Sequence, residues 1–122
     1  MTFYCGSPTT YQKIQKDFYK NTLVNDYGID VIIPDETERQ QIHEIIYGEL
    51  VQGEINDISR KIYQSIIKRL ENEGAQGVIL GCTEIPLLIK AQDVDIPIFD
   101  TTKIHAEKAV ELALNWCTNI LQ

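Results

Sequence analysis

The chain has 122 residues and a formal net charge of −7, with 43% hydrophobic and 24% charged residues. This mixture is typical of one globular domain that is long enough to bury a hydrophobic core. The negative charge and the lack of a basic stripe argue against nucleic-acid binding. No apolar run approaches the roughly 18 residues of a membrane span. The first residues lack the pattern of a secretory signal, so we expect a cytoplasmic protein.

Strands and helices alternate along the chain. Short apolar or β-branched runs predict strands at residues 2–5, 29–33, 78–80 and 96–99. The third run is continuously apolar, which is typical of a strand buried on both faces of a parallel sheet. No internal repeat or linker interrupts the pattern. We therefore expect a single α/β domain, residues 1–122, with about four mostly parallel strands flanked by helices.

Caps and stop signals place the first two helices. The first is expected to follow Thr9 or Thr10 and to end before Gly28. Asp35, with Glu38 three residues later, has the spacing of a capping box and should begin the second, which Gly53 should end. The expected apolar face of this second helix consists of Ile42, Ile45, Ile46 and Leu50.

Three further helices are expected. One begins at Asn56 or Asp57, ends at Gly74 and has an apolar face of Ile58, Ile62, Ile66 and Leu70. A short helix over residues 84–90 tolerates Pro86 in its first turn. The last follows the capping segment 100–102, and its apolar residues are Ile104, Ala109, Val110, Ala113 and Leu114.

Polar residues capable of chemistry follow three of the predicted strands. These segments are Cys5-Gly6-Ser7, Gly81-Cys82-Thr83-Glu84, and Asp100-Thr101-Thr102 with His105 one turn later. Ligands of open parallel sheets bind beyond the carboxyl ends of the strands, so these segments should converge on one edge. Asp100 and Thr101 have a second explanation, because such residues also cap helices.

The three cysteines, Cys5, Cys82 and Cys117, are odd in number and widely spaced, so we expect neither a disulfide framework nor a metal site. A lone cysteine is more often a buried apolar side chain than a nucleophile. Cys82 differs because cysteine is a poor helix cap and Gly81 leaves room for a ligand. A helix N-terminus after Cys82 would lower the pKa of its thiol and could hold a carboxylate.

The segment from Gly74 to Ile85 resembles the second cysteine motif of the aspartate/glutamate racemase superfamily, near its aspartate-racemase branch. The resemblance continues in the same order over nearly the whole chain, in the segments Asp17–Lys20, Ile33–Asp35, Ile45–Leu50, Ser59–Arg60 and Phe99–Glu107. It implies a racemase that uses no cofactor, with a two-lobed α/β fold and an active site between the lobes. One thiolate would remove the substrate α-proton while a thiol opposite delivers another.

The resemblance also assigns individual residues. Cys82 matches the catalytic cysteine of the second lobe, while Thr83 and Glu84 match its neighbours. His105 matches a position near the site, and with Thr101 these residues are our candidates for substrate binding. Cys5 occupies a strand position that is aliphatic in relatives and Cys117 lies in the last helix, so neither is expected to act as a base.

The chain departs from the family because it corresponds only to the C-terminal half, so the first lobe and its cysteine are expected to be absent. The last helix would then lack its packing partner, which predicts a homo-oligomer or binding to a separately supplied first lobe. Aspartate-specific relatives often carry a basic residue where this chain has Gln52, which leaves the amino-acid substrate open.

Two other functions stay open at this point. Some superfamily members decarboxylate a malonate and reprotonate it from a single cysteine, which would need only Cys82. Alternatively, the chain is a truncated racemase-like protein that folds and associates without catalysis. A nucleotide or phosphate binder is a weaker alternative, because neither glycine-rich fingerprint is present.

Overall fold

The computed structural model describes residues 2–6 and 13–120, with side chains described from residue 20 to residue 117. Four parallel strands form one sheet in the order β2-β1-β3-β4. Their bounds are Thr2–Gly6 for β1, Asp30–Ile32 for β2, Gly77–Leu80 for β3 and Ile98–Asp100 for β4. The predicted α/β class and the parallel sheet are confirmed.

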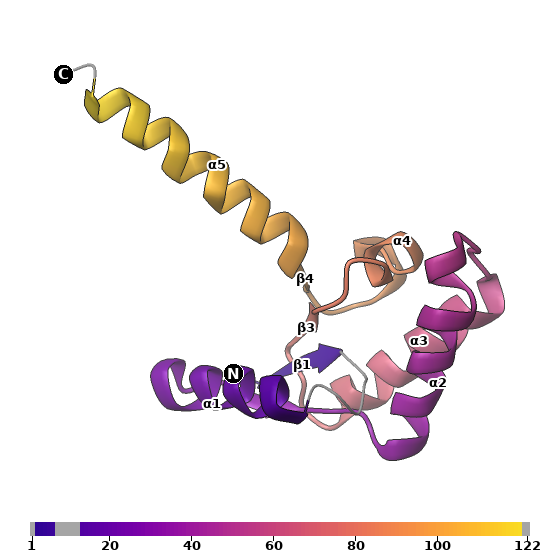
Figure 1. Ribbon diagram of the computed structural model, residues 1–122. Coiled ribbons are helices and arrows are strands. Elements are labelled where there is room, and N and C mark those ends of the chain that lie inside the picture. Colours follow the sequence, from indigo (N-terminus) through magenta and orange to yellow (C-terminus); the bar gives the residue numbers. More distant parts are fainter. Residues whose placement is uncertain (1, 7–12, 121–122) are drawn as a thin grey trace.

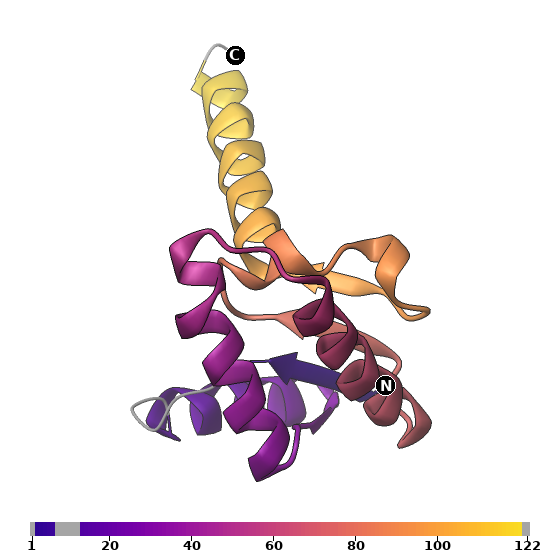
Figure 2. The same cartoon turned by 90° about the vertical axis from the view of Figure 1, so that its right-hand side faces the viewer.

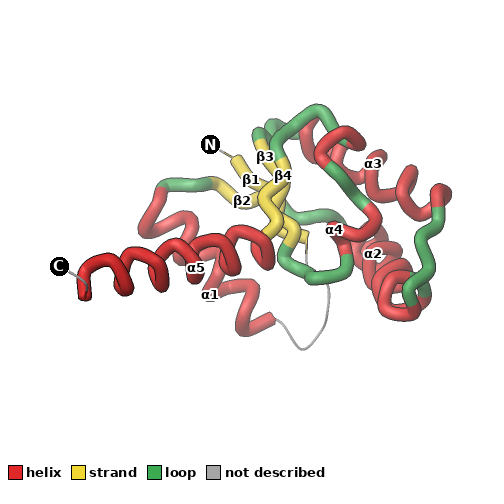
Figure 3. Tube along the Cα trace, turned by 90° about the horizontal axis from the view of Figure 1, so that it is seen from above, coloured by secondary structure: helices red, strands yellow, loops and turns green. Residues whose placement is uncertain are grey.

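The helices divide between the two faces of the sheet. Figure 3 shows α2 (Glu36–Gly48), α3 (Asp57–Asn72) and α4 (Ile85–Leu88) on one side. On the other side lie α1 (Lys13–Tyr27) and α5 (Thr101–Ile120). Short 3₁₀ helices, η2 (Leu50–Gln52) and η3 (Ala91–Asp93), follow α2 and α4. In Figures 1 and 2, α5 points away from the rest of the molecule. Within the described residues, no helix is both long and apolar enough to cross a membrane.

The capping box predicted for α2 is present. Asp35 Oδ1 accepts a hydrogen bond from the Glu38 backbone N–H at 2.9 Å, and Glu38 Oε2 accepts one from the Asp35 N–H at 3.0 Å. Glu38 also forms a two-point ion pair with Arg69 of α3, in which Arg69 Nε donates to Glu38 Oε1 at 2.5 Å. One carboxylate therefore both begins α2 and ties it to α3.

The end of α2 differs from the prediction. The helix ends at Gly48 rather than Gly53, and the chain continues through η2 to Gly53, whose φ of 81° is the left-handed conformation that glycine adopts most easily. Leu50 nevertheless stays in the core at 2% exposure, as its place in the apolar pattern predicts. The apolar pattern therefore located the buried residues correctly but not the change of helix type.

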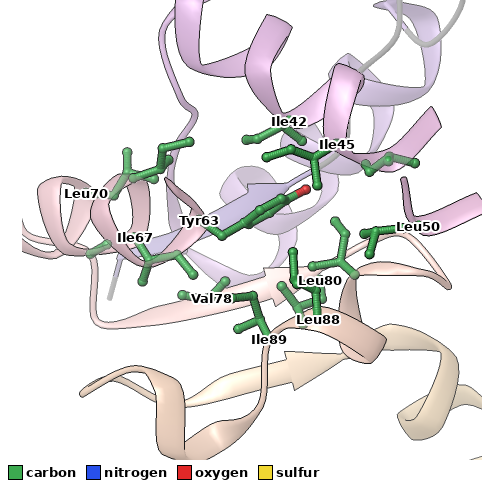
Figure 4. Close-up of a cluster of buried hydrophobic side chains, with 14 residues drawn as sticks. Ile42, Ile45, Leu50, Tyr63, Ile67, Leu70, Val78, Leu80, Leu88 and Ile89 are labelled. Carbon is green, nitrogen blue, oxygen red and sulfur yellow. The ribbon is translucent and has the colours of Figure 1, made fainter. Parts of the chain in front are cut away.

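The core lies between the sheet and the layer of α2, α3 and α4. Figure 4 shows side chains of α2 and α3 meeting those of β3 and α4. Val78 and Leu80 of β3 belong to this cluster, whereas Ile79, also buried, does not. This alternation follows from the two-residue period of a strand, which turns Ile79 to the opposite face.

The buried face of α3 was predicted incorrectly in part. Ile66 and Leu70 are buried, but Ile58 at the start of the helix is 70% exposed. The face that packs is rotated, and its buried members are Ser59, Tyr63, Ile66, Ile67 and Leu70. Asn56 rather than Asp57 caps the helix, since its side chain accepts from the Ile58 N–H at 2.8 Å.

Tyr63 lies in the middle of the core with 1% exposure (Figure 4). Its hydroxyl is buried and has no hydrogen-bond partner among the described residues. Burial, and secondarily the charge of a Cys82 thiolate, raise the pKa of the Tyr63 phenol. The phenol is therefore kept neutral in the folded chain.

Replacing Ile66 with alanine should destabilise the chain by about 2–5 kcal/mol, because it leaves a cavity between α3 and the sheet. Ile58→Ala, on the exposed side of the same helix, is the matched control and should change stability by at most about 0.5 kcal/mol. Urea unfolding followed by circular dichroism measures both. An equal loss of unfolding free energy in the two variants would contradict the assignment of Ile66 to the buried face and Ile58 to the exposed face of α3.

The free energy of unfolding should fall as the pH rises through the alkaline range. The unfolded Tyr63 phenol ionises near its ordinary pKa of about 10, whereas the folded phenol has a raised pKa and stays neutral. Above the pKa of the unfolded phenol, the unfolded state has lost a proton that the folded state keeps. A further rise in pH therefore favours unfolding. Tyr63→Phe should flatten this part of the slope in urea unfolding at several pH values.

Tyr27→Phe is the control for this pH series, because Tyr27 is 71% exposed and should leave the slope unchanged. Tyr63→Phe should also cost little stability at pH 7, since it removes a buried hydroxyl without a described partner. A steep alkaline loss that persists in Tyr63→Phe would show that another group causes it.

Candidate active site

Three strands bring their carboxyl ends to one edge of the sheet. Gly6 of β1 pairs with Leu80 of β3, and Leu80 pairs with Asp100 of β4. The predicted convergence of the strand ends is thus confirmed for the described residues, while Ser7 lies outside them. Cys5 lies in β1 opposite Ile79, but its side chain is outside the described residues. Of these three strands β3 is the middle one, and Cys82 lies in the loop that follows it.

Cys82 forms a short hydrogen bond with Glu84. Its Sγ donates to Glu84 Oε2 at 2.8 Å across two residues of the loop that leaves β3. The cysteine is partly buried and packs against the hydrophobic core from this edge. A thiol so placed touches the core on one side and a carboxylate on the other.

The pKa of the Cys82 thiol is raised, which contradicts the lowered pKa expected from a helix N-terminus. Burial is the largest cause, and the hydrogen bond and negative charge of Glu84 add to it. The backbone N–H groups of Glu84 and Ile85 act in the opposite direction, toward the thiolate, but they do not prevail. The prediction is wrong because α4 is only four residues long and a carboxylate stands beside the sulfur.

Glu84 is held in its place by both of its neighbours in the motif. Hydrogen bonds from Cys82 and then from the Thr83 side chain lower the pKa of the Glu84 carboxyl, so this group is charged at neutral pH. Thr83 itself is exposed. Thr83 is a predicted substrate-binding residue, and in this structure its side chain donates to the Glu84 carboxylate.

Asp100 and Thr101 have structural roles at the start of α5. Asp100 Oδ1 accepts from the backbone N–H groups of Thr102 at 3.0 Å and Lys103 at 3.2 Å, which makes it a helix cap. Thr101 Oγ1 donates to the Leu80 carbonyl oxygen at 2.9 Å. This bond ties the start of α5 to the end of β3, two residues before Cys82. Capping, one of the two explanations open for Asp100, accounts for its contacts.

The remaining candidates lie on α5. His105 is exposed one turn after Thr101. Cys117 is exposed toward the far end of the same helix. The chain thus gathers Cys82, Thr83 and Glu84 in one loop, with Thr101 bonded to the strand that precedes it. Among the described residues, no three His, Cys, Asp or Glu side chains form a cluster that could hold a metal ion.

Tyr63 is the neighbour of Cys82 that the sequence analysis missed. The thiolate charge of Cys82 contributes to the raised pKa of the Tyr63 phenol, so the two groups lie close enough to interact. The signal was present in the sequence, because Ser59, Tyr63, Ile66 and Leu70 also follow helical spacing. Choosing the isoleucine-rich stripe instead left Tyr63 out of the predicted apolar face.

A family model described as Asp/Glu/Hydantoin racemase matches residues 9–109 of the chain. An uncharacterized protein encoded in the pnlA 3′ region of Pectobacterium carotovorum subsp. carotovorum is 30% identical over 108 residues. That alignment covers 87% of this chain and 70% of the Pectobacterium protein.

Two crystal structures are similar to the whole fold. A Yersinia pestis protein assigned to the Asp/Glu racemases superposes with a TM-score of 0.81 at 45% identity. The superposition covers 93% of this chain and 48% of the Yersinia chain. An aspartate racemase homologue from Pyrococcus horikoshii OT3 superposes with a TM-score of 0.77 at 38% identity. The superposition covers 92% of this chain and 48% of the Pyrococcus chain. The chain spans about half the length of these two relatives. The resemblance seen in the sequence is confirmed, and the chain belongs to the Asp/Glu/hydantoin racemase family.

Proposed function

We propose that this chain is one lobe of a cofactor-independent amino-acid racemase of the aspartate/glutamate class, with Cys82 as one of two thiols that exchange the substrate α-proton. The observation that carries the proposal is the place of Cys82. It is a partly buried thiol at the carboxyl end of the central strand pair, with its proton directed to a carboxylate at 2.8 Å. Family membership makes racemisation the reaction that fits this thiol best.

Cys82 would act as an acid in one direction and as a base in the other. As a thiol it gives its proton to the α-carbon from one face, after a base on the opposite face has taken the original α-proton. As a thiolate it performs the reverse step. The backbone N–H groups of Glu84 and Ile85, which favour the charged sulfur, would stabilise the thiolate that remains after donation.

We propose that the second base comes from a first lobe or from a second copy of this chain. Cys117 is exposed on α5, and we assign it no catalytic role. We propose that residues 1–122 correspond to the second lobe of the two-lobed family fold, in keeping with the 48% coverage of both solved relatives. A first lobe, or a second copy of this chain, would then close the site over Cys82.

The exposed surface of α5 supports such a partner. Every residue from Thr102 to Cys117 is exposed, including Val110 at 58%, Leu114 at 63% and Trp116 at 70%. In proteins most helical stability comes from tertiary packing of an apolar face, so α5 gains stability when another surface packs on it. We propose that α5 is part of the interface with the first lobe or with a second copy of this chain.

The substrate is proposed to be a small amino acid with aspartate or glutamate as the default. Thr83 is exposed beside Cys82, and its hydroxyl would turn from Glu84 to donate to a bound carboxylate. Gln52 is exposed at the end of η2 and is uncharged, so it would hydrogen-bond an acidic side chain without neutralising it. His105 is exposed on the first turns of α5 and is proposed to approach the substrate from that side.

The α-proton of aspartate or glutamate should exchange with solvent deuterium when this chain is assembled with a first-lobe partner or as an oligomer. Cys82→Ser should lower the exchange rate by about 10²–10⁴-fold, because a positioned acid/base contributes roughly that factor. Proton NMR in D2O measures the rate. Cys117→Ser is the matched control and should exchange at the wild-type rate, since Cys117 is exposed on α5.

Exchange that persists in Cys82→Ser would contradict the role of this thiol. A wild-type assembly that exchanges no α-proton would contradict racemisation. In that case, release of CO2 from an arylmalonate that depends on Cys82 would identify the decarboxylase alternative. Inactivity in both assays would favour a non-catalytic racemase-like protein.

In the absence of a first lobe, the 122-residue chain should self-associate through α5. Val110→Glu places a charge on the apolar side of the helix and should shift the chain toward monomer in sedimentation equilibrium. Asn115→Glu adds the same charge at an exposed polar position and should leave the association unchanged. A wild-type chain that stays monomeric at high concentration would contradict an interface between two copies of this chain.

A further inference from the structure

Glu84 occupies the cap position of α4 without capping it. Its backbone is helical, with φ −89° and ψ −31°, and its side chain accepts no hydrogen bond from the α4 backbone. Instead the carboxylate turns back to Cys82, with Oε2 2.8 Å from Sγ. The usual structural explanation for an acidic residue before a helix therefore does not apply to Glu84.

The groups that face Cys82 come from two elements. The loop after β3 supplies the Glu84 carboxylate, which the Thr83 side chain also bonds. Helix α3 supplies the phenol of Tyr63, which is 1% exposed and has no hydrogen-bond partner among the described residues. A neutral phenol contributes no charge, so the Glu84 carboxylate is the charged neighbour that acts on the sulfur. A negative charge at this distance opposes loss of the thiol proton.

We propose that Glu84 is a positioning residue for Cys82, which holds the sulfur as the protonated thiol and directs its S–H group. In the free protein at neutral pH, Cys82 is then the proton donor of the two-base pair rather than the proton acceptor. This inference rests on the proposed acid/base role of Cys82. It replaces the substrate-binding role that the sequence suggested for Glu84 with a role that acts through the sulfur.

The direction of the proton follows from this arrangement. The opposite base takes the α-proton of the bound amino acid, and the Cys82 S–H turns from Glu84 toward the α-carbon and delivers its proton there. The sulfur is then a thiolate beside a carboxylate, and this pairing makes it a stronger base for the reverse reaction. Glu84 thus favours the thiol before the reaction and raises the basicity of the thiolate after it.

The test is the pH dependence of Cys82 alkylation by iodoacetamide in the 122-residue chain, measured peptide by peptide with mass spectrometry. Only the thiolate reacts, so the midpoint of the rate profile reports the thiol pKa. Glu84→Gln keeps the size of the side chain and removes its charge. It should move the Cys82 midpoint to lower pH and speed alkylation at pH 7, since each unit of fall raises the thiolate fraction about tenfold.

Two controls separate this effect from general changes. Glu36→Gln removes the same charge at the exposed start of α2 and should leave the Cys82 midpoint unchanged, because a distant exposed charge is screened by salt. The alkylation profile of Cys117 in the same samples should be the same in wild type and Glu84→Gln. Glu84→Ala provides a second variant and should also lower the midpoint, with circular dichroism to establish that both variants fold.

A Cys82 midpoint that stays in place, or rises, in folded Glu84→Gln and Glu84→Ala would overturn the proposal. Alkylation needs neither substrate nor a first lobe, so its outcome is separate from the racemase assay. A lowered midpoint together with α-proton exchange that survives in Cys82→Ser would uphold the Glu84 contact and contradict the racemase role. An unchanged midpoint together with α-proton exchange that depends on Cys82 would contradict the role of Glu84 and uphold the racemase role of Cys82.

Discussion

The parallel register of β1, β3 and β4 sets the positions of the chemical groups in this chain. Gly6, Leu80 and Asp100 lie side by side, so three loops leave the sheet at one edge. Parallel strands require crossover helices, and α2 and α3 return the chain from β2 to β3 while covering one face. Their packing is fixed by Glu38, which completes the capping box of α2 and pairs with Arg69, and by a core that includes Val78 and Leu80. The loop with Cys82 starts from β3, in which all four residues are buried.

Within that loop, the thiol is governed by its nearest neighbours rather than by the helix that follows. Four residues of α4 give a weak dipole, and two backbone N–H groups that favour the thiolate are outweighed by burial and by Glu84. A raised pKa suits an acid that must be protonated before it acts, and the same environment makes the thiolate a better base once the proton has gone. Hydrogen bonds from Cys82 and Thr83 keep Glu84 charged. In the motif Cys-Thr-Glu, the side chains of Cys82 and Thr83 thus both donate hydrogen bonds to the Glu84 carboxylate.

Much of this structure could be predicted from the sequence, because hydrophobic periodicity and cap chemistry are local. The strands, the capping box of Asp35 and Glu38, and the edge that carries Cys82 all follow from such signals. The rotated face of α3 could not be chosen reliably, because two stripes with helical spacing compete and only tertiary packing selects the one with Tyr63. The predicted direction of the Cys82 pKa shift was wrong for a similar reason. Local sequence signals do not show that the Glu84 side chain turns back to the sulfur. Family membership came from the motif itself, which is specific enough to be recognised in a single sequence.

The proposed racemisation requires that Cys82 face the substrate once a first lobe, or a second copy of this chain, is in place. The most direct measurement is a crystal structure of the assembled protein with bound aspartate or glutamate. We expect Cys82 Sγ within about 3–3.5 Å of the α-carbon, the separation of reacting atoms that are poised to react, with a second base on the opposite face. A substrate bound elsewhere, or a Cys82 sulfur that faces solvent in the complete assembly, would contradict the central claim.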